Sequence, residues 1–379
     1  MYQEFISFTK KTFKTDEFIP LHAPIFIGNE KKYLNECIDS TFVSSVGKFV
    51  DLFENEMVKF TGAKHAIATS NGTAALHIAL LMAGVEHNDE VITQPLTFIA
   101  TVNALSYIGA SPVFVDIDKD TLSLSPEKLE HFLTHKTEMV NGNCINKKTK
   151  KKIKAVVPMH TFGFSARIDE IITVCNRFNI ATVEDAAESL GSYYKGQHTG
   201  TFGLLGTFSF NGNKTITTGG GGMLVTNDDE IARKAKHITT TAKIPHPWDY
   251  EHDMIGYNYR LPNINAALGY AQMEELSFIL KKKKILADKY ETFFKDKSIQ
   301  YITGPKESIS NYWLNAVLLE NLEERNSFLK VTNENGVMTR PIWKLMNSLP
   351  MFKNAQTGNL DNAKYFEERV INIPSSVIL

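Results

Sequence analysis

The first two thirds of the chain alternate between two hydrophobic periods. Residues 48–61 carry apolar side chains at helical spacing, on Phe49, Leu52, Phe53, Met57 and Phe60, which predicts an amphipathic helix. Short apolar runs typical of buried strands occur at residues 65–69, 90–93, 112–116, 155–158 and 180–184. Helical segments separate the first four of these runs, at residues 73–83, 98–108 and 125–133. This alternation predicts an α/β fold with a mostly parallel sheet covered by helices.

The pattern changes in the last third of the chain. After Pro262 a long helical stretch runs to about Lys295, and we interpret its lysine run, 281–284, as a solvent-exposed helix face. Segments that suggest a small α+β domain follow at residues 312–319, 322–334 and 359–369. We therefore predict a large domain over residues 1–275, with 1–19 as an N-terminal extension, and a small C-terminal domain over residues 276–379.

Residues 141–154 are polar and rich in lysine. We predict a solvated loop that leads into a buried strand. A nucleic-acid-binding patch is the weaker alternative, because this stretch lacks the aromatic residues on which bases stack.

Composition narrows the class of protein. With 379 residues, of which 43% are hydrophobic, the chain can bury a large core. A formal net charge of -1 provides no overall field that favours nucleic acid or an acidic membrane. Its three cysteines, Cys37, Cys144 and Cys175, lack paired or metal-ligand spacing, so we expect a reducing compartment and no metal site. The chain has no signal-peptide pattern and no uncharged apolar stretch long enough to cross a bilayer, which predicts a cytoplasmic enzyme.

One lysine lies in a short polar loop between two predicted strands. Lys214 follows Ser209-Phe210-Asn211-Gly212-Asn213, between strands at 206–210 and 222–226. A lysine held there can form a Schiff base with an aldehyde cofactor. Upstream, Asp185 follows the strand at 180–184, at the edge where parallel sheets bind ligands. A carboxylate facing a pyridine nitrogen keeps it protonated, so the pair suits pyridoxal phosphate (PLP). The alternatives are a surface lysine and a helix-capping aspartate.

Three further positions could serve the same cofactor. Gly72 and Thr73 follow a strand and begin a helix, whose free amides can bind phosphate; an ordinary Asn-Gly turn is the alternative. Phe98 follows a strand end and could lie against an aromatic ring, although a single phenylalanine is usually part of the core. Glu188 could face the phenolic oxygen of the cofactor, or it could be a solvent-exposed acid.

The four glycines at residues 219–222 do not form a dinucleotide-binding loop. A Rossmann fingerprint follows a strand and begins a helix, whereas these glycines precede the strand-like run 223–226. We predict that they allow the backbone to pass closely beside the cofactor.

These motifs together, in this order along the chain, resemble the DegT-type sugar aminotransferases. That family consists of PLP enzymes with the aspartate aminotransferase fold (fold type I), which has a three-layer αβα large domain and a small C-terminal α+β domain. The resemblance covers nearly the whole chain, from residues 19–21 to residues 373–375. Finer details resemble the branch that serves legionaminic-acid and related diamino-sugar pathways, and hence surface polysaccharide or lipopolysaccharide biosynthesis; these are residues 39–50, 159–163 and 340–343.

The resemblance implies a role for each motif residue. Lys214 would carry PLP and shuttle protons, Asp185 would pair with the pyridinium nitrogen, and Phe98 would stack on the ring. Glu188 would approach the ring oxygen. Relatives often carry glutamine or histidine there, and a carboxylate beside a phenolate is repelled unless it is protonated or turned away. The remaining expected contacts are Gly72, Thr73, Ser209 and Asn258 with the phosphate, and Ser45, His160, Arg260 and Trp343 with the substrate.

Residues 256–260 match a family segment that reaches into the active site of the neighbouring subunit. The resemblance therefore implies an obligate homodimer with composite sites. It also implies a ping-pong transamination, in which L-glutamate converts PLP into pyridoxamine phosphate. The amino group then passes to C4 of a nucleotide-linked 4-keto-6-deoxy sugar, for which we expect a UDP-linked 2-acetamido sugar.

Three other functions stay open at this stage. A sugar dehydratase of the same fold is one, but relatives with that activity replace the Schiff-base lysine by histidine, whereas this chain keeps Lys214. A non-catalytic regulatory protein is another, although it would not need both Asp185 and Lys214. A nicotinamide-dependent dehydrogenase is the third, and the position of the glycines argues against it.

Overall fold

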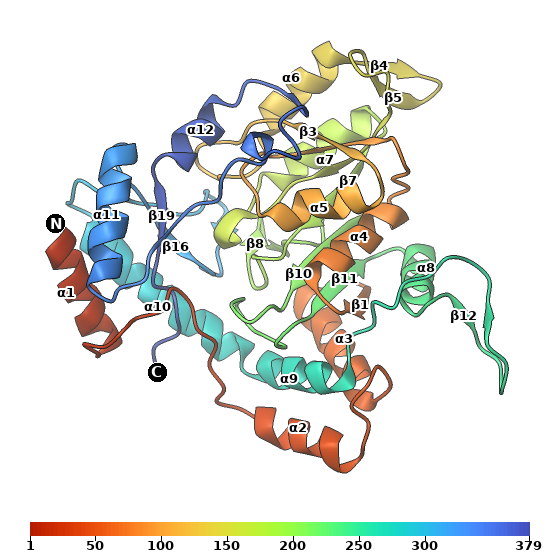
Figure 1. Cartoon of the computed structure of the whole chain (residues 1–379), viewed down its shortest axis with the longest axis horizontal. Coiled ribbons are helices and arrows are strands. Elements are labelled where there is room, and N and C mark those ends of the chain that lie inside the picture. Colours follow the sequence, from red (N-terminus) through yellow and green to blue (C-terminus); the bar gives the residue numbers. More distant parts are fainter.

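An eight-stranded sheet forms the centre of the protein, in a computed structural model that describes residues 1–379 (Figure 1). Its strand order is β1-β11-β10-β7-β6-β2-β3-β18. The strands are β1 His65–Thr69, β2 Glu90–Thr93, β3 Ser111–Phe114, β6 Ile153–Val157, β7 Ala181–Asp185, β10 Leu205–Ser209, β11 Gly222–Thr226 and β18 Gln356–Thr357. β11 alone runs in the direction opposite to the other seven strands. The predicted mostly parallel sheet is confirmed, and seven strands end at the same edge.

Helices cover both faces of this sheet. One face packs against α4 Gly72–Met82, α5 Ile99–Tyr107 and α8 Asp229–Thr239. The other face packs against α3 Lys48–Thr61, α6 Pro126–Lys136, α7 Ile168–Arg177 and α9 Asn263–Glu274, with α2 Glu30–Asp39 outside α9. Successive side chains of β1 point to opposite faces of the sheet. Ile67 packs in the core beneath α4, α5 and α8, whereas Ala66 and Ala68 pack in the core beneath α3 and α9. The three-layer αβα arrangement follows.

The C-terminal part builds a smaller antiparallel sheet in the order β14-β16-β19-β17. Its strands are β14 Gln300–Tyr301, β16 Asn315–Leu318, β17 Arg340–Pro341 and β19 Val370–Ile373. Its helices are α10 Leu276–Phe294, α11 Leu322–Glu334 and α12 Asp361–Glu367. The N-terminal helix α1 Tyr2–Phe13 lies beside α10 and α11 (Figure 1), where Phe5 packs against Tyr290, Phe294 and Phe328. The domain boundary at 275/276 stays a prediction, since α1 packs with the small part and β18 joins the large sheet.

Short elements complete the chain. A small sheet in the order β15-β8-β9 consists of β15 Ser308–Ile309, β8 Tyr193–Tyr194 and β9 Gln197–His198. The hairpin β12 Lys243–Ile244 and β13 Glu251–His252 extends away from the body (Figure 1). Two 3-10 turns lie at Thr161–Gly163 and Met346–Ser348. No helix is both long enough and apolar enough to cross a membrane.

Two predictions about lysine-rich stretches were wrong in part. Residues 141–154 are not simply a loop, since β4 Thr137–Val140 and β5 Asn143–Asn146 pair as a hairpin. Its turn residues Asn141 and Gly142 have φ angles of 49° and 77°, a conformation that an Asn-Gly pair favours. The run 281–284 is not uniformly exposed, because Lys283 is only 1% exposed.

The predicted long helix after Pro262 is in fact two helices, α9 and α10, which meet at Glu275.

Candidate active site

Loops from several strands meet at the carboxyl edge of the large sheet. Asp185 ends β7 and Ser209 ends β10, while Gly72 begins the helix after β1 and Phe98 directly precedes the helix after β2. Because these strands are parallel, their ends lie at one edge. The loops enclose a cavity of about 230 Å³. Eight residues predicted from the sequence line it: Gly72, Thr73, Phe98, Asp185, Glu188, Ser209, Lys214 and Trp343.

The amine of Lys214 lies between a carboxyl group and an indole ring. Its Nζ is 3.4 Å from Oε1 of Glu188 and 3.9 Å from the centroid of the Trp313 ring. The loop is held by the Lys214 amide, which donates to Asn211 O at 3.0 Å, and by Trp313 Nε1, which donates to Asn213 O at 2.7 Å. The side chain is 12% exposed, so the alternative of a surface lysine is excluded.

The carboxyl group of Asp185 is buried and has no cationic partner. The residue is 6% exposed. Its Oδ2 accepts a hydrogen bond from the Thr101 hydroxyl at 2.7 Å, and its Oδ1 accepts one from the Ala187 amide at 3.2 Å. No lysine, arginine or histidine forms an ion pair with it. A buried carboxylate of this kind is stabilised by a charged hydrogen-bond donor, and the cavity that it faces has room for one.

The N-terminus of α4 offers a place for a phosphate. Asn71 caps the helix by accepting a hydrogen bond from the Ala74 amide at 2.8 Å, and the amides of the first residues, Gly72 and Thr73, have no acceptor within the helix. A Cβ on Gly72 would lie 2.8 Å from Ser209 Cβ, and one on Gly222 would lie 2.3 Å from the Asn71 carbonyl oxygen. Within the glycine run, Gly222 therefore passes close to the backbone of Asn71, and the predicted passage beside the cofactor stays a prediction.

Glu188 is buried and turned toward Lys214, so the solvent-exposed alternative is wrong. It is 3% exposed, and its Oε2 accepts a hydrogen bond from the Phe162 amide at 2.9 Å. Burial raises the pKa of Glu188 to about 7, although the nearby Lys214 opposes the shift. Phe162 adopts a φ of 58°, which is unfavourable for an L-residue. This strained turn directs its amide at the carboxyl group.

Aromatic side chains form the open side of the cavity. Phe98 is 48% exposed, and its ring centroid lies 6.4 Å from that of Trp343. Trp343 also contacts Phe162, with centroids 5.1 Å apart. Phe98 therefore belongs to the cavity wall and not to the core. Together with Asp185, Lys214 and the α4 N-terminus, this wall fits a flat, phosphate-bearing pyridine aldehyde.

The predicted substrate contact of His160 is not supported by the structure. The residue is fully buried. Its Nε2 lies 3.0 Å from Glu184 Oε2, and its Nδ1 accepts a hydrogen bond from the Ala166 amide at 3.1 Å. Glu184 also accepts hydrogen bonds from the amides of Gly200, Phe202 and Gly203. Both ring nitrogens thus serve a structural network behind the sheet edge.

Three other predicted residues do not line the cavity of their own chain. Ser45 lies in the loop before α3. Asn258 is exposed and bridges Thr240 through its backbone. Arg260 lines a separate cavity of about 510 Å³ together with Lys243 and His246, and its Nε is buried without a hydrogen-bond partner.

The structure adds two residues that sequence reasoning missed. Thr101 holds Asp185 through its hydroxyl. A signal for it existed, since Thr101 lies in the first turn of a helix that follows a strand end. Trp313 supports Lys214 from a segment, 312–319, that the sequence assigns only to the small α+β domain. No local pattern around Trp313 indicates this role.

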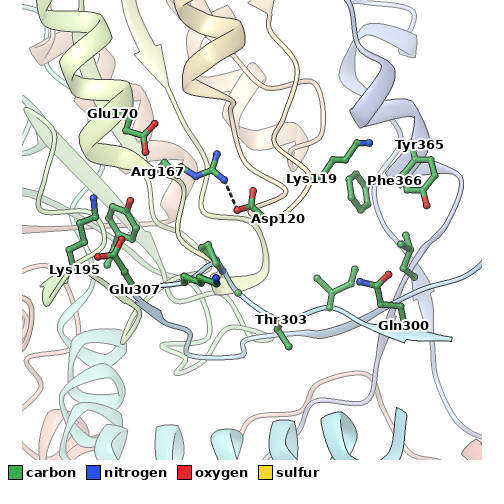
Figure 2. A pocket seen from close by; sticks show the side chains of 16 residues that line it. Lys119, Asp120, Arg167, Glu170, Lys195, Gln300, Thr303, Glu307, Tyr365 and Phe366 are labelled. Carbon is green, nitrogen blue, oxygen red and sulfur yellow. Dashed lines mark hydrogen bonds and ion pairs between the residues drawn. The ribbon is translucent and has the colours of Figure 1, made fainter. Parts of the chain in front are cut away.

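A larger cavity lies between the large sheet and the small one, away from these groups. It has a volume of about 690 Å³, and its walls carry charges of both signs (Figure 2). Arg167 Nη2 pairs with Asp120 Oδ2 at 2.5 Å, and Lys195 pairs with Asp169 at 2.8 Å. None of the residues predicted from the sequence for the site lines this cavity, so it is not the candidate active site.

Known proteins resemble this chain over almost its whole length. Residues 25–379 match the DegT/DnrJ/EryC1/StrS aminotransferase family. The chain is 38% identical over 359 residues to GDP-perosamine synthase from Escherichia coli O157:H7, an alignment that covers 95% of this chain and 93% of that protein.

Solved structures show the same fold. The chain is similar to Helicobacter pylori PseC, an aminotransferase involved in pseudoaminic acid biosynthesis, with a TM-score of 0.85, 27% identity, and coverage of 94% of each chain. Spr1654 from Streptococcus pneumoniae, solved in its PLP form, has a TM-score of 0.85 at 24% identity, with coverage of 96% of this chain and 94% of that one.

Proposed function

The chain belongs to the DegT/DnrJ/EryC1/StrS aminotransferase family, and we propose that it transfers an amino group from L-glutamate to C4 of a nucleotide-linked 4-keto-6-deoxy sugar. The protein is a PLP-dependent nucleotide-sugar aminotransferase, in agreement with the fold and with the names of its relatives. One observation supports the proposed residue roles above all others. The amine of Lys214 and the buried carboxyl group of Asp185, which has no cationic partner, line one cavity.

When bound, PLP supplies an aldehyde carbon that links to amines and a ring that takes up negative charge from carbon. Lys214 would hold that carbon through its ε-amine in the resting enzyme. Once the amino donor takes its place, Lys214 Nζ would accept the donor's α-proton and later deliver a proton to C4 of the sugar. Asp185 would keep the ring nitrogen protonated, with Thr101 fixing the carboxylate. Gly72, Thr73 and Ser209 would hold the phosphate.

Glu188 and Phe98 would complete the cofactor site. A glutamate whose pKa is near 7 can keep its proton beside a phenolic oxygen, which removes the repulsion expected of a charged carboxylate. Phe98 would cover one face of the ring. The Phe162 amide would hold Glu188 in place from the side opposite Lys214.

Two nucleotides are candidates for the sugar substrate. The finer resemblance at residues 39–50, 159–163 and 340–343 favours a UDP-linked 2-acetamido-2,6-dideoxy-4-ketohexose on a legionaminic-acid type of pathway. The relative with 38% identity is named for a GDP-sugar product, which makes a GDP-linked 4-keto-6-deoxy sugar the second candidate. Trp343 lines the cavity and is the proposed sugar contact.

The decisive assay follows both half-reactions. Purified protein with L-glutamate and a panel of UDP-, GDP- and dTDP-linked ketosugars should form 2-oxoglutarate and one amino sugar. Borohydride reduction followed by peptide mapping should place the cofactor on Lys214, and Lys214→Ala should abolish turnover. A label on another side chain would refute the roles proposed here. Consumption of ketosugar without 2-oxoglutarate would favour the dehydratase.

We further propose a homodimer with shared active sites. The hairpin β12–β13 projects from the body (Figure 1), and around it Trp248, Tyr250 and Ile255 are 75%, 82% and 85% exposed. Large apolar side chains at this exposure favour burial against another protein surface. The adjoining residues Asn258 and Arg260 would then reach the partner's cavity, where the unpaired guanidinium of Arg260 suits a diphosphate.

Subunit mixing tests this arrangement. Lys214→Ala and Asn258→Ala variants should each be nearly inactive alone. After mixing and exchange, hybrid dimers contain one unaltered site, so roughly a quarter of the wild-type activity should return. No recovery, despite exchange of subunits measured by light scattering and mass spectrometry, would show that each chain forms its site alone.

A further inference from the structure

Lys283 is a buried lysine that no carboxylate neutralises. It lies in α10 and is 1% exposed. Its Nζ donates to Ser375 O at 2.8 Å and to Trp313 O at 3.2 Å, and it lies 3.0 Å from His22 Nε2. An ammonium group has three N–H donors, so these three acceptors match it completely. The amine therefore joins three segments that are far apart in sequence.

Packing alone does not account for a lysine at this place. Burial lowers the pKa of Lys283 to about 7, because the charged form is removed from water without an opposite charge. An apolar side chain of similar length would avoid this penalty. What distinguishes the site is its three hydrogen-bond acceptors. Of the three residues that supply them, Trp313 is the one that lines the cofactor cavity.

Trp313 connects Lys283 to Lys214. Its carbonyl oxygen accepts from Lys283, while its indole Nε1 donates to Asn213 O at 2.7 Å, one residue before Lys214. The face of the same ring lies 3.9 Å from Lys214 Nζ. Trp313 thus fixes the backbone beside Lys214 and also supports its amine. On the other side of the Trp313 backbone, the Asn311 side chain accepts from the Trp313 amide at 2.8 Å.

His22 is the third residue in contact with the Lys283 amine. Its Nε2 contacts Lys283, and its Nδ1 is buried without a hydrogen-bond partner. Burial and the positive charges of Lys283 and Lys214 lower the pKa of His22. The imidazole is therefore neutral, and its Nε2 can accept a hydrogen bond from the Lys283 amine.

We propose that Lys283 is a positioning residue for Lys214, which it holds in register with the cavity through the backbone and indole ring of Trp313. This inference rests on the proposed function, in which Lys214 carries the cofactor and moves protons. Proton transfer depends on the placement of the amine to within an ångström. Loss of the Lys283 amine would let the Trp313 segment shift, and both supports of Lys214 would loosen together.

The test compares holoenzymes with three substitutions. Lys283→Met keeps an unbranched chain of similar length and removes the amine. Trp313→Phe keeps an aromatic face and removes the hydrogen bond to Asn213. Tyr290→Phe is the matched control, because Tyr290 also lies in α10 and its hydroxyl donates to Pro374 O at 2.9 Å, next to Ser375, without contact to Trp313.

We expect Lys283→Met and Trp313→Phe each to lower kcat about tenfold with little change in KM for L-glutamate. The double variant should also lose about tenfold and not a hundredfold, since both act through one element. The pH midpoint of the visible absorption of the bound cofactor, which reports the protonation state at the Lys214 nitrogen, should fall by about half a unit as the indole moves away. Tyr290→Phe should change thermal stability only.

Three results would overturn the inference. One is a Lys283→Met enzyme that loses stability as the Tyr290→Phe control does but keeps kcat and the absorption midpoint. Another is a double variant whose losses multiply. The third is a wild-type enzyme whose borohydride-trapped cofactor maps away from Lys214, which would remove the proposed function as well. Normal trapping on Lys214 combined with either of the first two results would refute the positioning role alone.

Discussion

Replacement of Glu188 by glutamine should change how the stability of the protein depends on pH. Glutamine keeps an oxygen to accept the Phe162 amide at the position where Glu188 accepts it at 2.9 Å, but it cannot ionise. The comparison therefore isolates the ionisation of one buried carboxyl group. We consider the cofactor-free protein, so that only the charges of the chain act on Glu188.

The magnitude follows from the displacement of the Glu188 pKa, from 4.5 to about 7, which is caused chiefly by burial. A raised folded-state pKa means that the folded protein binds more protons than the unfolded chain between these two values. The stabilising contribution is complete below pH 4.5 and is lost as the pH rises through 7. A displacement of this size corresponds to roughly 3 kcal/mol. Above pH 7 the Glu188→Gln variant should therefore gain up to that amount over the wild type, relative to their difference at acid pH.

Urea unfolding at a fixed protein concentration measures the effect. The free energy of unfolding of both proteins should be compared at pH 5, 6, 7 and 8, and the advantage of Glu188→Gln should grow across this series. Glu320→Gln, at an exposed position, should show no such trend. A constant difference between wild type and Glu188→Gln from pH 5 to pH 8 would refute the view that Glu188 is buried with its proton.

Three shorter predictions test other contacts. Gly72→Ala should weaken PLP binding by about tenfold, measured by fluorescence titration, because its Cβ would meet Ser209 at 2.8 Å, whereas Gly212→Ala, with open space around it, should bind normally. Thr101→Val removes the 2.7 Å hydrogen bond to Asp185 and should lower kcat about tenfold in steady-state assays; an unchanged kcat would contradict a role for Thr101. Burial lowers the pKa of Lys283 to about 7 in the folded protein, so above that pH the unfolded chain binds more protons than the folded protein. The free energy of unfolding of the wild type should therefore rise relative to that of Lys283→Met, by roughly 1.4 kcal/mol per pH unit between pH 8 and 9.5. Parallel urea curves for these two proteins over that range would contradict it.

The carboxyl edge of the sheet was predictable because strand ends are visible in the sequence. Apolar runs locate β7 and β10, and the polar residues that follow them, Asp185 and Lys214, must lie at the same edge once the strands are parallel. The glycine run was predictable for a similar reason, since it precedes a strand and begins no helix. Local period and turn chemistry are sufficient for these inferences.

Burial of single polar residues was not predictable in the same way. His160 and Lys283 both lie in stretches whose composition suggested exposure or function, yet both are buried and bonded inside the protein. Whether a polar side chain points into a core depends on acceptors supplied by other segments. For Lys283 these are His22, Trp313 and Ser375, which lie up to 261 residues away in sequence.

The sequence by itself determined the sheet, the order of the motifs, and the lysine and aspartate at its carboxyl edge, because hydrophobic period and strand-end position are local properties. Only the tertiary structure decided what surrounds these two groups: the indole beneath Lys214, the hydroxyl that holds Asp185 and the raised pKa of Glu188. These features arise from contacts between segments distant in sequence, and desolvation acts on a group only after the chain has closed around it.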